Sequence, residues 1–385
     1  MAKNLGRIQC LDGLRGIACL MIFVHHFLLT FYPATFYGDS AISHGFMKWD
    51  AYISQSPMGA IFNGNFWVCE FLLISGFVIS GKIYRCKESD YAEIMIKRYL
   101  KLAFPIFVVS ILVYFLLKNN FLYHSEINEI TGSVWTATHY NNVENVSVKD
   151  IFLTSFYKVE FIGDNTFSTA FWMLSYLFFG YYVAILLAIM SRGKDNRIIM
   201  EFGILGVIFW HQCSYLVMSI IGAGIAYFYE YYKRLFIERR ISCVFIVLAL
   251  FFVGYPTGVV PDNIYANIDM DYLSMHIVAA TLLFIGIMKS TIFRKILEGR
   301  ICLFLGNISF AVYLVHIPIL FSVTHYIFMG LFSRGIGYQI SSIITFVMSI
   351  IIVVFIAHVF NIFIEVPCDK FSKKIIKQIC INKNS

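Results

Sequence analysis

The sequence predicts an all-α polytopic membrane protein with about ten transmembrane helices and both termini in the cytoplasm. Three observations support this prediction. Hydrophobic residues make up 59% of the 385 residues and charged residues 14%, and the mean hydropathy of +0.73 is above that of soluble globular domains. Apolar segments of transmembrane length recur along the chain. Nearly all basic residues fall between these segments on one side.

Ten apolar segments are long enough, or nearly so, to cross about 30 Å of hydrocarbon as helices of about 20 residues. The fifth and seventh are short, so nine or eleven spans also fit the sequence. The first is expected to remain an uncleaved helix, because Arg15 interrupts its start and an A-x-A cleavage site is absent. The ten segments are 14–33, 60–81, 99–117, 171–191, 197–211, 213–231, 242–257, 272–289, 302–323 and 339–364.

Basic residues predict the orientation of these segments. With the N-terminus in the cytoplasm, 25 of the 30 Lys and Arg residues lie on the inner side, as the positive-inside rule expects. The net charge of +7 therefore reflects mostly topology, and no nucleic-acid partner is expected. We predict a transmembrane domain over 1–368 with one long outer loop, 118–170, and a basic cytoplasmic tail over 369–385 that lies against anionic lipid. The five outer basic residues are Lys48, Lys118, Lys149, Lys158 and Arg334.

The nine cysteines indicate neither a metal site nor a disulfide framework. None forms a CxxC pair, and no group has the spacing of metal ligands. They are interpreted as small apolar residues of the membrane interior. No bound metal is expected.

The stretch LDGLRGIACLMIFVHHF, residues 11–27, places ionisable side chains in an apolar helix. Such groups are costly in a membrane and by default suggest a functional site. At about 100° and 1.5 Å per residue, Arg15 and His26 differ by only about 20° and share a face, with His26 about 16 Å deeper. His25 falls about 80° from Arg15, on another face. We expect Arg15 at the cytoplasmic mouth and His26 near the middle of the membrane.

Two interpretations of this pair remain open. A neutral histidine at mid-membrane can act as a general base, and an arginine at the mouth suits a phosphate-bearing donor from the cytoplasm. In the alternative, both Arg15 and His26 are helix-packing groups, and the arginine only extends to the interface. For His25, packing is the favoured interpretation.

Five further stretches follow in the order of a known family's motifs. They are FLLISGFVIS (71–80), KRYLKLAFP (97–105), FWMLSYLFFGYY (171–182), LGNISFAVYLVHIPIL (305–320) and FIEVP (363–367). Together with residues 11–27, they resemble the membrane acyltransferase-3 family over nearly the whole chain. The R-x10-H pattern, which Arg15 and His26 match, is the most specific part. The SGF and YLxHxP motifs are moderately specific, and FIEVP alone is weak.

This resemblance implies a ten-helix, acyl-CoA-dependent O-acyltransferase in the bacterial inner membrane. Such enzymes commonly transfer acetyl from acetyl-CoA to a hydroxyl of an envelope glycan or glycolipid, for example an O-antigen, capsule or exopolysaccharide. Acyl-CoA is then a co-substrate, no cofactor is bound, and the partners are membrane lipid and the glycan. The family's essential histidine maps to His26 and its arginine to Arg15. Its basic pair maps to Arg98 and Lys101, where two arginines are more common.

Two positions depart from the family pattern. The fourth-helix motif W-x-L-x-x-E keeps Trp172 and Leu174, but Leu177 stands at the position of the acid. An acid is also common six residues before the SGF serine, where this chain has Cys69. The adjacent Glu70 is a candidate substitute on a different helix face. These changes put in doubt any mechanism that needs an acid on the fourth helix.

Each candidate residue on the donor side has an expected role. We expect His26 to take the proton of the acceptor hydroxyl as it attacks the thioester, with a transient acyl-histidine as the variant mechanism. Arg15, Arg98 and Lys101 are expected to bind the CoA phosphates at the inner face. For Arg98 and Lys101, the alternative is plain positive-inside topology.

The acceptor-side candidates are less constrained. Ser309, Tyr313 and His316 fall at i, i+4 and i+7 on one helix face, where they would bind the acceptor or orient His26. The alternative for this face is an interhelical hydrogen-bond network, and for Ser75 it is close helix packing. The predicted substrate-binding residues are Glu70, Ser75, Trp172, Ser309, Tyr313 and His316.

Two other functions remain compatible with the sequence. A transporter or flippase would also bury Arg, Glu and His in a ten-helix bundle, although we find no internal repeat. A degenerate relative acting as an assembly partner is the third interpretation, and Leu177 is its best support. The ordered motifs favour the enzyme.

Overall fold

The computed structural model describes residues 8–54, 56–140, 143, 146–193, 197–212, 214–232, 241–256 and 264–381. It is 82% helical with no strand in the described residues, and seven segments are long and apolar enough to cross a membrane. The predicted all-α polytopic fold is therefore confirmed. The seven segments are built on α1 (Gln9–Phe31), α4 (Gly64–Ile83), α5 (Tyr91–Lys118), α10 (Trp172–Ser191), α14 (Tyr272–Lys289), α17 and α18 (Ser309–Ile319, His325–Phe332), and α19 and α20 (Tyr338–Phe360, Val366–Ile381).

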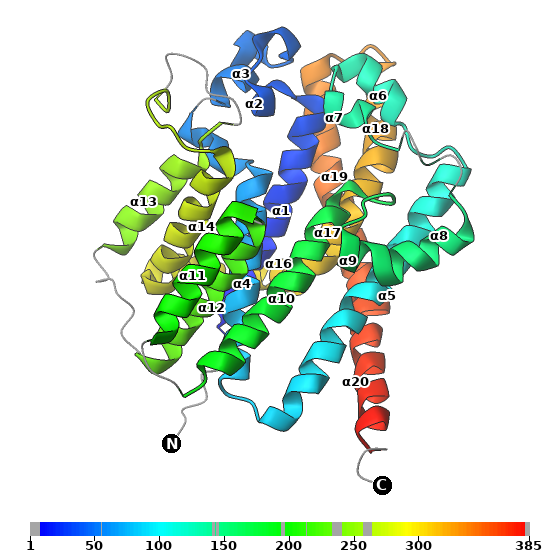
Figure 1. Ribbon diagram of the computed structural model, residues 1–385. Helices are drawn as coiled ribbons and strands as arrows, with labels where there is room; N and C mark the ends of the chain where they lie inside the picture. Colours follow the sequence, from blue (N-terminus) through cyan, green and yellow to red (C-terminus); the bar gives the residue numbers. More distant parts are fainter. Residues whose placement is uncertain are drawn as a thin grey trace.

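Every one of the ten predicted apolar segments contains a helix. Beside the seven listed above, α11 (Arg197–Gln212), α12 (Ser214–Tyr231) and α13 (Ser242–Val253) occupy the other three. Helix α1 begins and α20 ends toward the same end of the bundle, the lower end in Figure 1. We call this the inner end and the opposite one the outer end. That the inner end faces the cytoplasm stays a prediction from the basic residues.

Helix α1 packs against α4, α17 and α16 (Arg300–Asn307), and glycines bring it close to α16. A Cβ atom on Gly16 would lie 2.4 Å from the backbone nitrogen of Gly306. A Cβ atom on Gly306 would lie 2.2 Å from the carbonyl oxygen of Asp12. No side chain fits at either position. The two glycines therefore set how closely α1 meets the segment that leads into α17.

The outer end of α1 is held by side chains from distant segments. Pro33 has no N–H group, so the carbonyl of Leu29 lacks the donor that a continuing helix would supply. The Ser133 hydroxyl donates to this carbonyl at 2.7 Å, and the Tyr338 hydroxyl donates to the carbonyl of Phe31. These bonds fix α7 (Val134–Ala137) and the start of α19 against the last turn of α1.

The first half of the predicted outer loop 118–170 covers the outer end of the bundle. It contains α6 (His124–Thr131) and α7, which lie over α1 beside α2 (Ala34–Tyr37) and α3 (Trp49–Ile53). Figure 1 shows these short helices together at the top of the molecule. These short helices form a cover over the outer end of the bundle.

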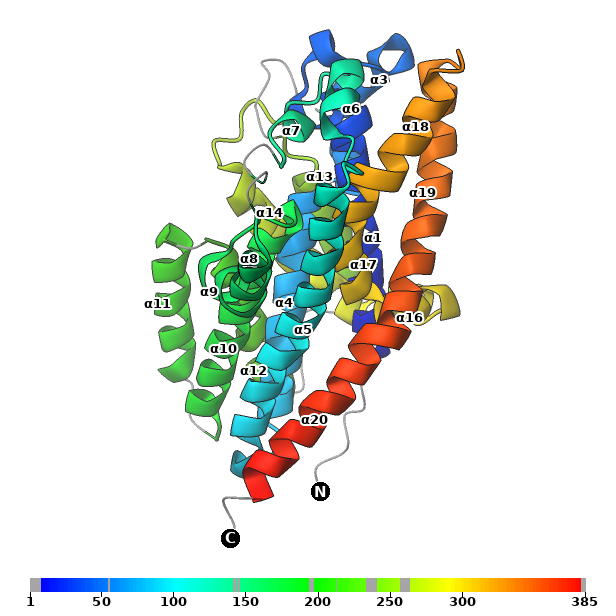
Figure 2. The same cartoon turned by 90° about the vertical axis from the view of Figure 1, so that its right-hand side faces the viewer.

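The second half of the same loop lies along the sides of the long helices instead. It consists of α8 (Val148–Leu153), the π-helical turn η5 (Thr154–Lys158) and α9 (Val159–Ile162). These elements pack against α5 and α10 (Figures 1 and 2). Such a position favours an apolar outer surface, and the exposed large side chains of this part are Val148, Phe152, Leu153, Tyr157, Phe161 and Ile162.

The chain ends in one long helical rod. Helix α19, the π-helical turn η8 (Asn361–Glu365) and α20 follow one another without a break (Figure 2), and α20 lies beside α5. The Asp369 carboxylate joins the two helices, because it lies 3.2 Å from Lys97 Nζ and 2.8 Å from Lys101 Nζ. Its other oxygen lies 2.8 Å from Lys373 Nζ. The predicted start of the basic tail at residue 369 is therefore inside a packed helix.

We expect Gly16→Ala to destabilise the protein, because the new Cβ would overlap the backbone of α16. Overpacking of this kind typically costs about 1–3 kcal/mol. The melting temperature of the detergent-purified protein should therefore fall by several degrees. Thermal unfolding followed by intrinsic tryptophan fluorescence measures this shift.

Gly203→Ala on α11 is the matched control, since no atom lies within 4 Å of the Cβ that it would add. Alanine is preferred over glycine inside an open helix by up to about 1 kcal/mol, so this melting temperature should stay constant or rise. An unchanged melting temperature for Gly16→Ala would contradict the close contact between α1 and α16.

Candidate active site

A cavity of about 900 Å³ lies toward the inner end, lined by residues of α1, α4, α5, α10, α16, α17, α19, η8 and α20. Pockets that hold small ligands and cofactors commonly have such volumes. Five of the residues predicted from the sequence line it: Arg15 on α1, Ser75 on α4, Arg98 and Lys101 on α5, and Ser309 on α17. The fold therefore brings candidates from both ends of the chain to one place.

Two arginines in the cavity form no ion pair with a carboxylate of the described residues. The Arg15 guanidinium lies over the ring of Phe71 at 5.3 Å, and the Arg98 guanidinium lies over the ring of Tyr181 at 4.7 Å. Arg98 Nε is buried without a hydrogen-bond partner. Because aromatic faces bind cations less strongly than carboxylates do, the pair keeps positive charge that suits a phosphate group.

Lys101 has a different electrostatic environment from the two arginines. Its Nζ lies 2.8 Å from Asp369, so an internal carboxylate already offsets its charge. The same carboxylate also holds Lys97 and Lys373. Lys101 therefore belongs to an ion-pair network between α5 and α20 at the wall of the cavity.

His26 is hydrogen-bonded to His316, and the contacts of His316 determine which nitrogen of each ring carries the proton. His316 Nδ1 lies 2.7 Å from the Tyr313 carbonyl oxygen and 3.1 Å from that of Val312. Carbonyl oxygens only accept, so Nδ1–H donates and Nε2 keeps its lone pair. This Nε2 lies 3.1 Å from His26 Nδ1, which must then be the donor. The lone pair of neutral His26 is therefore on Nε2, where it can accept a proton.

The loop that contains α7 covers His26 from the outer side. The centroid of the Trp135 ring lies 5.1 Å from that of His26, and the two planes are 27° apart. His139 packs against Trp135 and Phe321, with centroid distances of 4.4 Å and 5.1 Å. Burial lowers the pKa of His139 to about 4, so its imidazole is neutral near pH 7 and can pack among aromatic rings.

His25 has a structural environment. Its Nδ1 lies 3.0 Å from the carbonyl oxygen of Phe62, to which it donates. Its ring fills the space beside Gly64, where a Cβ atom would lie 2.5 Å from the imidazole. This geometry favours the packing interpretation of His25 and makes it a suitable control for His26.

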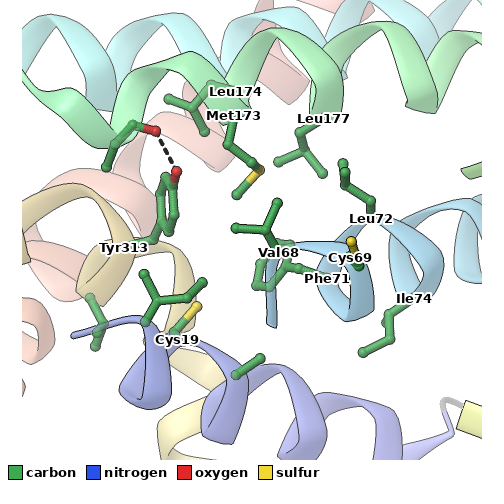
Figure 3. Packing of buried hydrophobic residues seen from close by; sticks show 14 of the residues in the cluster. Cys19, Val68, Cys69, Phe71, Leu72, Ile74, Met173, Leu174, Leu177 and Tyr313 are labelled. Atoms are coloured by element: carbon green, nitrogen blue, oxygen red, sulfur yellow. Dashed lines mark hydrogen bonds between the residues drawn. The ribbon is translucent and has the colours of Figure 1, made fainter. Parts of the chain in front are cut away.

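Packed side chains separate the cavity from His26. Ser309 lines the cavity, but His26 and His316 do not. Between these levels on α17 lies Tyr313, which is buried and whose hydroxyl donates to the Ala170 carbonyl. Along α17, Tyr313 therefore lies between the level of the cavity and the level of His26. Figure 3 shows the buried side chains of this region, and we call four of them the packed layer: Cys19, Met173, Leu174 and Tyr313.

Comparison with known proteins decides the family. The acyltransferase-3 family model, described as an acyltransferase domain, matches residues 8–361. The chain belongs to the acyltransferase-3 family. The match confirms the resemblance found in the motifs, and it indicates a membrane acyltransferase. No curated protein and no solved structure was found to match the chain.

In this acyltransferase, Leu177 on α10 stands where the family commonly has an acid. Its side chain is buried and lines the same cavity as Arg15 and Arg98. The carboxylates in the lining are Glu365 and Asp369, both from the last helical rod. Glu365 accepts a hydrogen bond from Asn361 Nδ2 at 2.8 Å. Acidic groups therefore do line the cavity, but they come from η8 and α20 and not from α10.

Four of the six predicted substrate-binding residues lie outside the cavity lining: Tyr313 and His316, described above, and Glu70 and Trp172. Glu70 is fully buried on α4, and neither of its carboxylate oxygens has a hydrogen-bond partner. Trp172 packs against Tyr215 and Tyr176, with centroid distances of 5.1 Å and 5.9 Å. These surroundings describe packing, and a substrate role for either residue stays a prediction.

Three residues at the site were not singled out from the sequence. Tyr181 lies in the FWMLSYLFFGYY stretch, but only the fold brings Arg98 over its ring. Asn361 donates to the Asn307 carbonyl at 3.2 Å as well as to Glu365. Trp135 lies in a loop with no apolar periodicity, so no local signal marks its contact with His26.

Because His316 Nε2 accepts from His26 Nδ1–H, two substitutions of His316 should have different effects. Leucine offers no acceptor to His26 Nδ1–H, so His316→Leu should lower the acyl-transfer rate about 10–100-fold, as the loss of the residue that orients a metal-binding histidine does. Glutamine can accept through its amide oxygen, so His316→Gln should retain much more activity. Steady-state rates across pH 5 to 9 measure the difference.

Both variants should keep the wild-type KM for the donor, because His316 does not line the cavity. Equal losses in the two variants, or a rise in KM without a change in kcat, would show that His316 acts only by packing.

Proposed function

We propose that this protein is an O-acyltransferase of the bacterial inner membrane that uses cytoplasmic acyl-CoA. It transfers an acyl group, most simply acetyl, to a hydroxyl of a cell-envelope glycan or glycolipid. One observation carries the proposal. Two arginines that form no ion pair with a carboxylate of the described residues lie in a cavity at the inner end, and a histidine whose free lone pair is on Nε2 lies above them in the same helix bundle.

The shape of acyl-CoA matches the separation between the two arginines and His26. Its phosphates are at one end, and its thioester is at the far end of a long, flexible pantetheine arm. Arg15 and Arg98 supply charge for the phosphates. Arg15 and His26 are eleven residues apart on α1 and therefore about 16 Å apart along the helix axis. The arm would cross this interval and bring the thioester carbonyl to His26.

The transfer needs one base that later returns its proton. His26 Nε2 takes the proton of the acceptor hydroxyl as the oxygen attacks the thioester carbonyl carbon. The tetrahedral intermediate then collapses, the C–S bond breaks, and the new C–O ester bond remains. The thiolate of CoA receives the proton from the imidazolium of His26. His316 Nε2 accepts from His26 Nδ1 throughout, which keeps the ring oriented.

The packed layer must rearrange for the arm to pass. Tyr313, Leu174 and Cys19 are buried in one core cluster. None of them carries a charge, so a neutral arm can displace them without removing an ion from its partner. The acceptor is expected to approach from the outer end of the bundle, which α6 and α7 cover.

The first test is thiol release from acetyl-CoA by the detergent-purified protein, supplied with a crude envelope-glycan fraction. We expect release by the wild type and by His25→Ala, and loss of about 10²–10⁴-fold in His26→Ala, the usual effect of removing a general base. Transfer of labelled acetyl to the glycan must accompany release.

Equal loss in both histidine variants would assign the pair to packing. Failure of the wild type with several acyl-CoAs and several glycan fractions would overturn the enzyme assignment. A transporter, or a relative that assists assembly, would then be the better interpretation.

Donor binding has a separate prediction. Arg98→Met removes the charge but keeps an unbranched side chain beside Tyr181, so the Kd for CoA should rise at least about tenfold, as expected when one charge-assisted hydrogen bond is lost. Isothermal titration calorimetry at two salt concentrations measures the effect. The wild-type Kd should increase with salt more steeply than that of the variant.

Arg294→Met is the matched control. Arg294 lies outside the cavity lining and pairs with Glu298 at 3.6 Å, so the Kd for CoA should not change. A wild-type Kd for CoA in Arg98→Met would show that the cavity does not bind the phosphates.

A further inference from the structure

The indole of Trp135 lies directly on the ring proposed as the base. Its centroid is 5.1 Å from that of His26, in a stacked arrangement, and the ring of His316 lies at the same 5.1 Å distance. His316 occupies the Nδ1 side of His26 through the hydrogen bond described above. Trp135 therefore covers His26 with an apolar surface that comes from the outer loop.

Specific contacts hold this cover in place. Ser133, two residues before Trp135, donates to the Leu29 carbonyl that Pro33 leaves without a helical donor. His139 Nδ1–H donates to the Trp135 carbonyl itself, at 2.5 Å. On the other side of the loop, His44 Nε2 lies 2.8 Å from the Thr131 carbonyl and donates to it. The stacked position of the indole is thus fixed from α1, from its own loop and from the segment before α3.

An apolar partner completes the cover. The centroid of the Trp135 ring lies 5.3 Å from that of Phe321. The ring of His139 also stacks on Phe321, with an angle of 19° between the two planes. Phe321 is fully buried. His26 itself is half-buried, and this set of rings packs over it at the outer end.

We propose that Trp135 is a specificity-determining residue that excludes water from His26, so that the acyl group passes to the acceptor hydroxyl and not to water. This inference rests on the proposed function. A histidine that activates a sugar hydroxyl can equally activate water, because both present an O–H group to the same lone pair. The choice between the acceptor and water must therefore depend on which molecule can reach His26. The acceptor is a molecule that can displace the Trp135 indole from His26.

Loss of the cover has a defined chemical consequence. Water replaces the acceptor, its oxygen attacks the thioester carbonyl, and the C–S bond breaks as a C–O bond forms. His26 moves the proton from water to the departing thiolate. The products are the free carboxylic acid and CoA thiol, so acyl transfer becomes thioester hydrolysis.

The experiment compares Trp135→Ala and Trp135→Phe with the wild type in detergent. Free thiol, labelled acetate and labelled glycan are measured in one reaction with acetyl-CoA, with and without the crude envelope-glycan fraction. We expect Trp135→Ala to release acetate several-fold faster than the wild type without glycan, and to acylate less glycan. Trp135→Phe keeps an aromatic ring and should fall between them.

Trp49→Ala is the matched control, because Trp49 also lies at the outer end, on α3, and packs against Tyr32 at a centroid distance of 5.2 Å. It should keep the wild-type ratio of acetate to acylated glycan. A Trp135→Ala protein that loses transfer without gaining acetate release would overturn the proposal, and so would the same gain in Trp49→Ala.

A second measurement does not depend on activity. Ethoxycarbonylation by diethyl pyrocarbonate, mapped by peptide mass spectrometry, reports how accessible His26 is. Labelling of His26 should rise several-fold in Trp135→Ala, while His276, which is fully buried, stays as in the wild type. Unchanged labelling of His26 overturns the proposal. If the wild type transfers no acyl group to any glycan, the proposed function fails, and the selection role of Trp135 fails with it, whatever the labelling shows.

Discussion

The hydrogen bond between His26 Nδ1 and His316 Nε2 joins α1 to α17, and the rest of the site depends on it. The same helix, α1, meets α16 closely at Gly16 and Gly306, where neither helix carries a side chain. The segment that follows α16 then places His316 beside His26. The position of the His316 ring in turn determines that the lone pair of His26 lies on Nε2.

The sequence predicted the helical segments and the alignment of Arg15 with His26, because both follow from one periodicity within one chain segment. It also predicted that Ser309, Tyr313 and His316 share a face. The fold shows that the three serve different levels: Ser309 lines the cavity, Tyr313 is in the packed layer, and His316 reaches His26. Helical spacing predicts direction around an axis, whereas depth relative to a neighbouring helix is set by packing.

Partners from distant segments could not be predicted in this way. Lys101 was expected to bind phosphate, but Asp369 offsets its charge, and nothing in the local sequence of α5 indicates that carboxylate. The tautomer of His316 depends on two carbonyl oxygens of its own helix, which every helix contains and which no residue type marks. Trp135 reaches His26 because Ser133 satisfies the carbonyl that Pro33 leaves free. Each of these contacts is a property of three-dimensional proximity.

The packed layer also bears on the energy supply of the cell. A membrane potential is worth about 2.3 kcal/mol per elementary charge for each 100 mV, and a water-filled path from one face to the other would let protons run down it. Cys19, Met173, Leu174 and Tyr313 are buried, uncharged side chains, and such side chains oppose a water-filled path. In the proposed reaction, the pantetheine arm would fill the space of the side chains that it displaced. The acyl group would then cross the membrane without opening a path for protons.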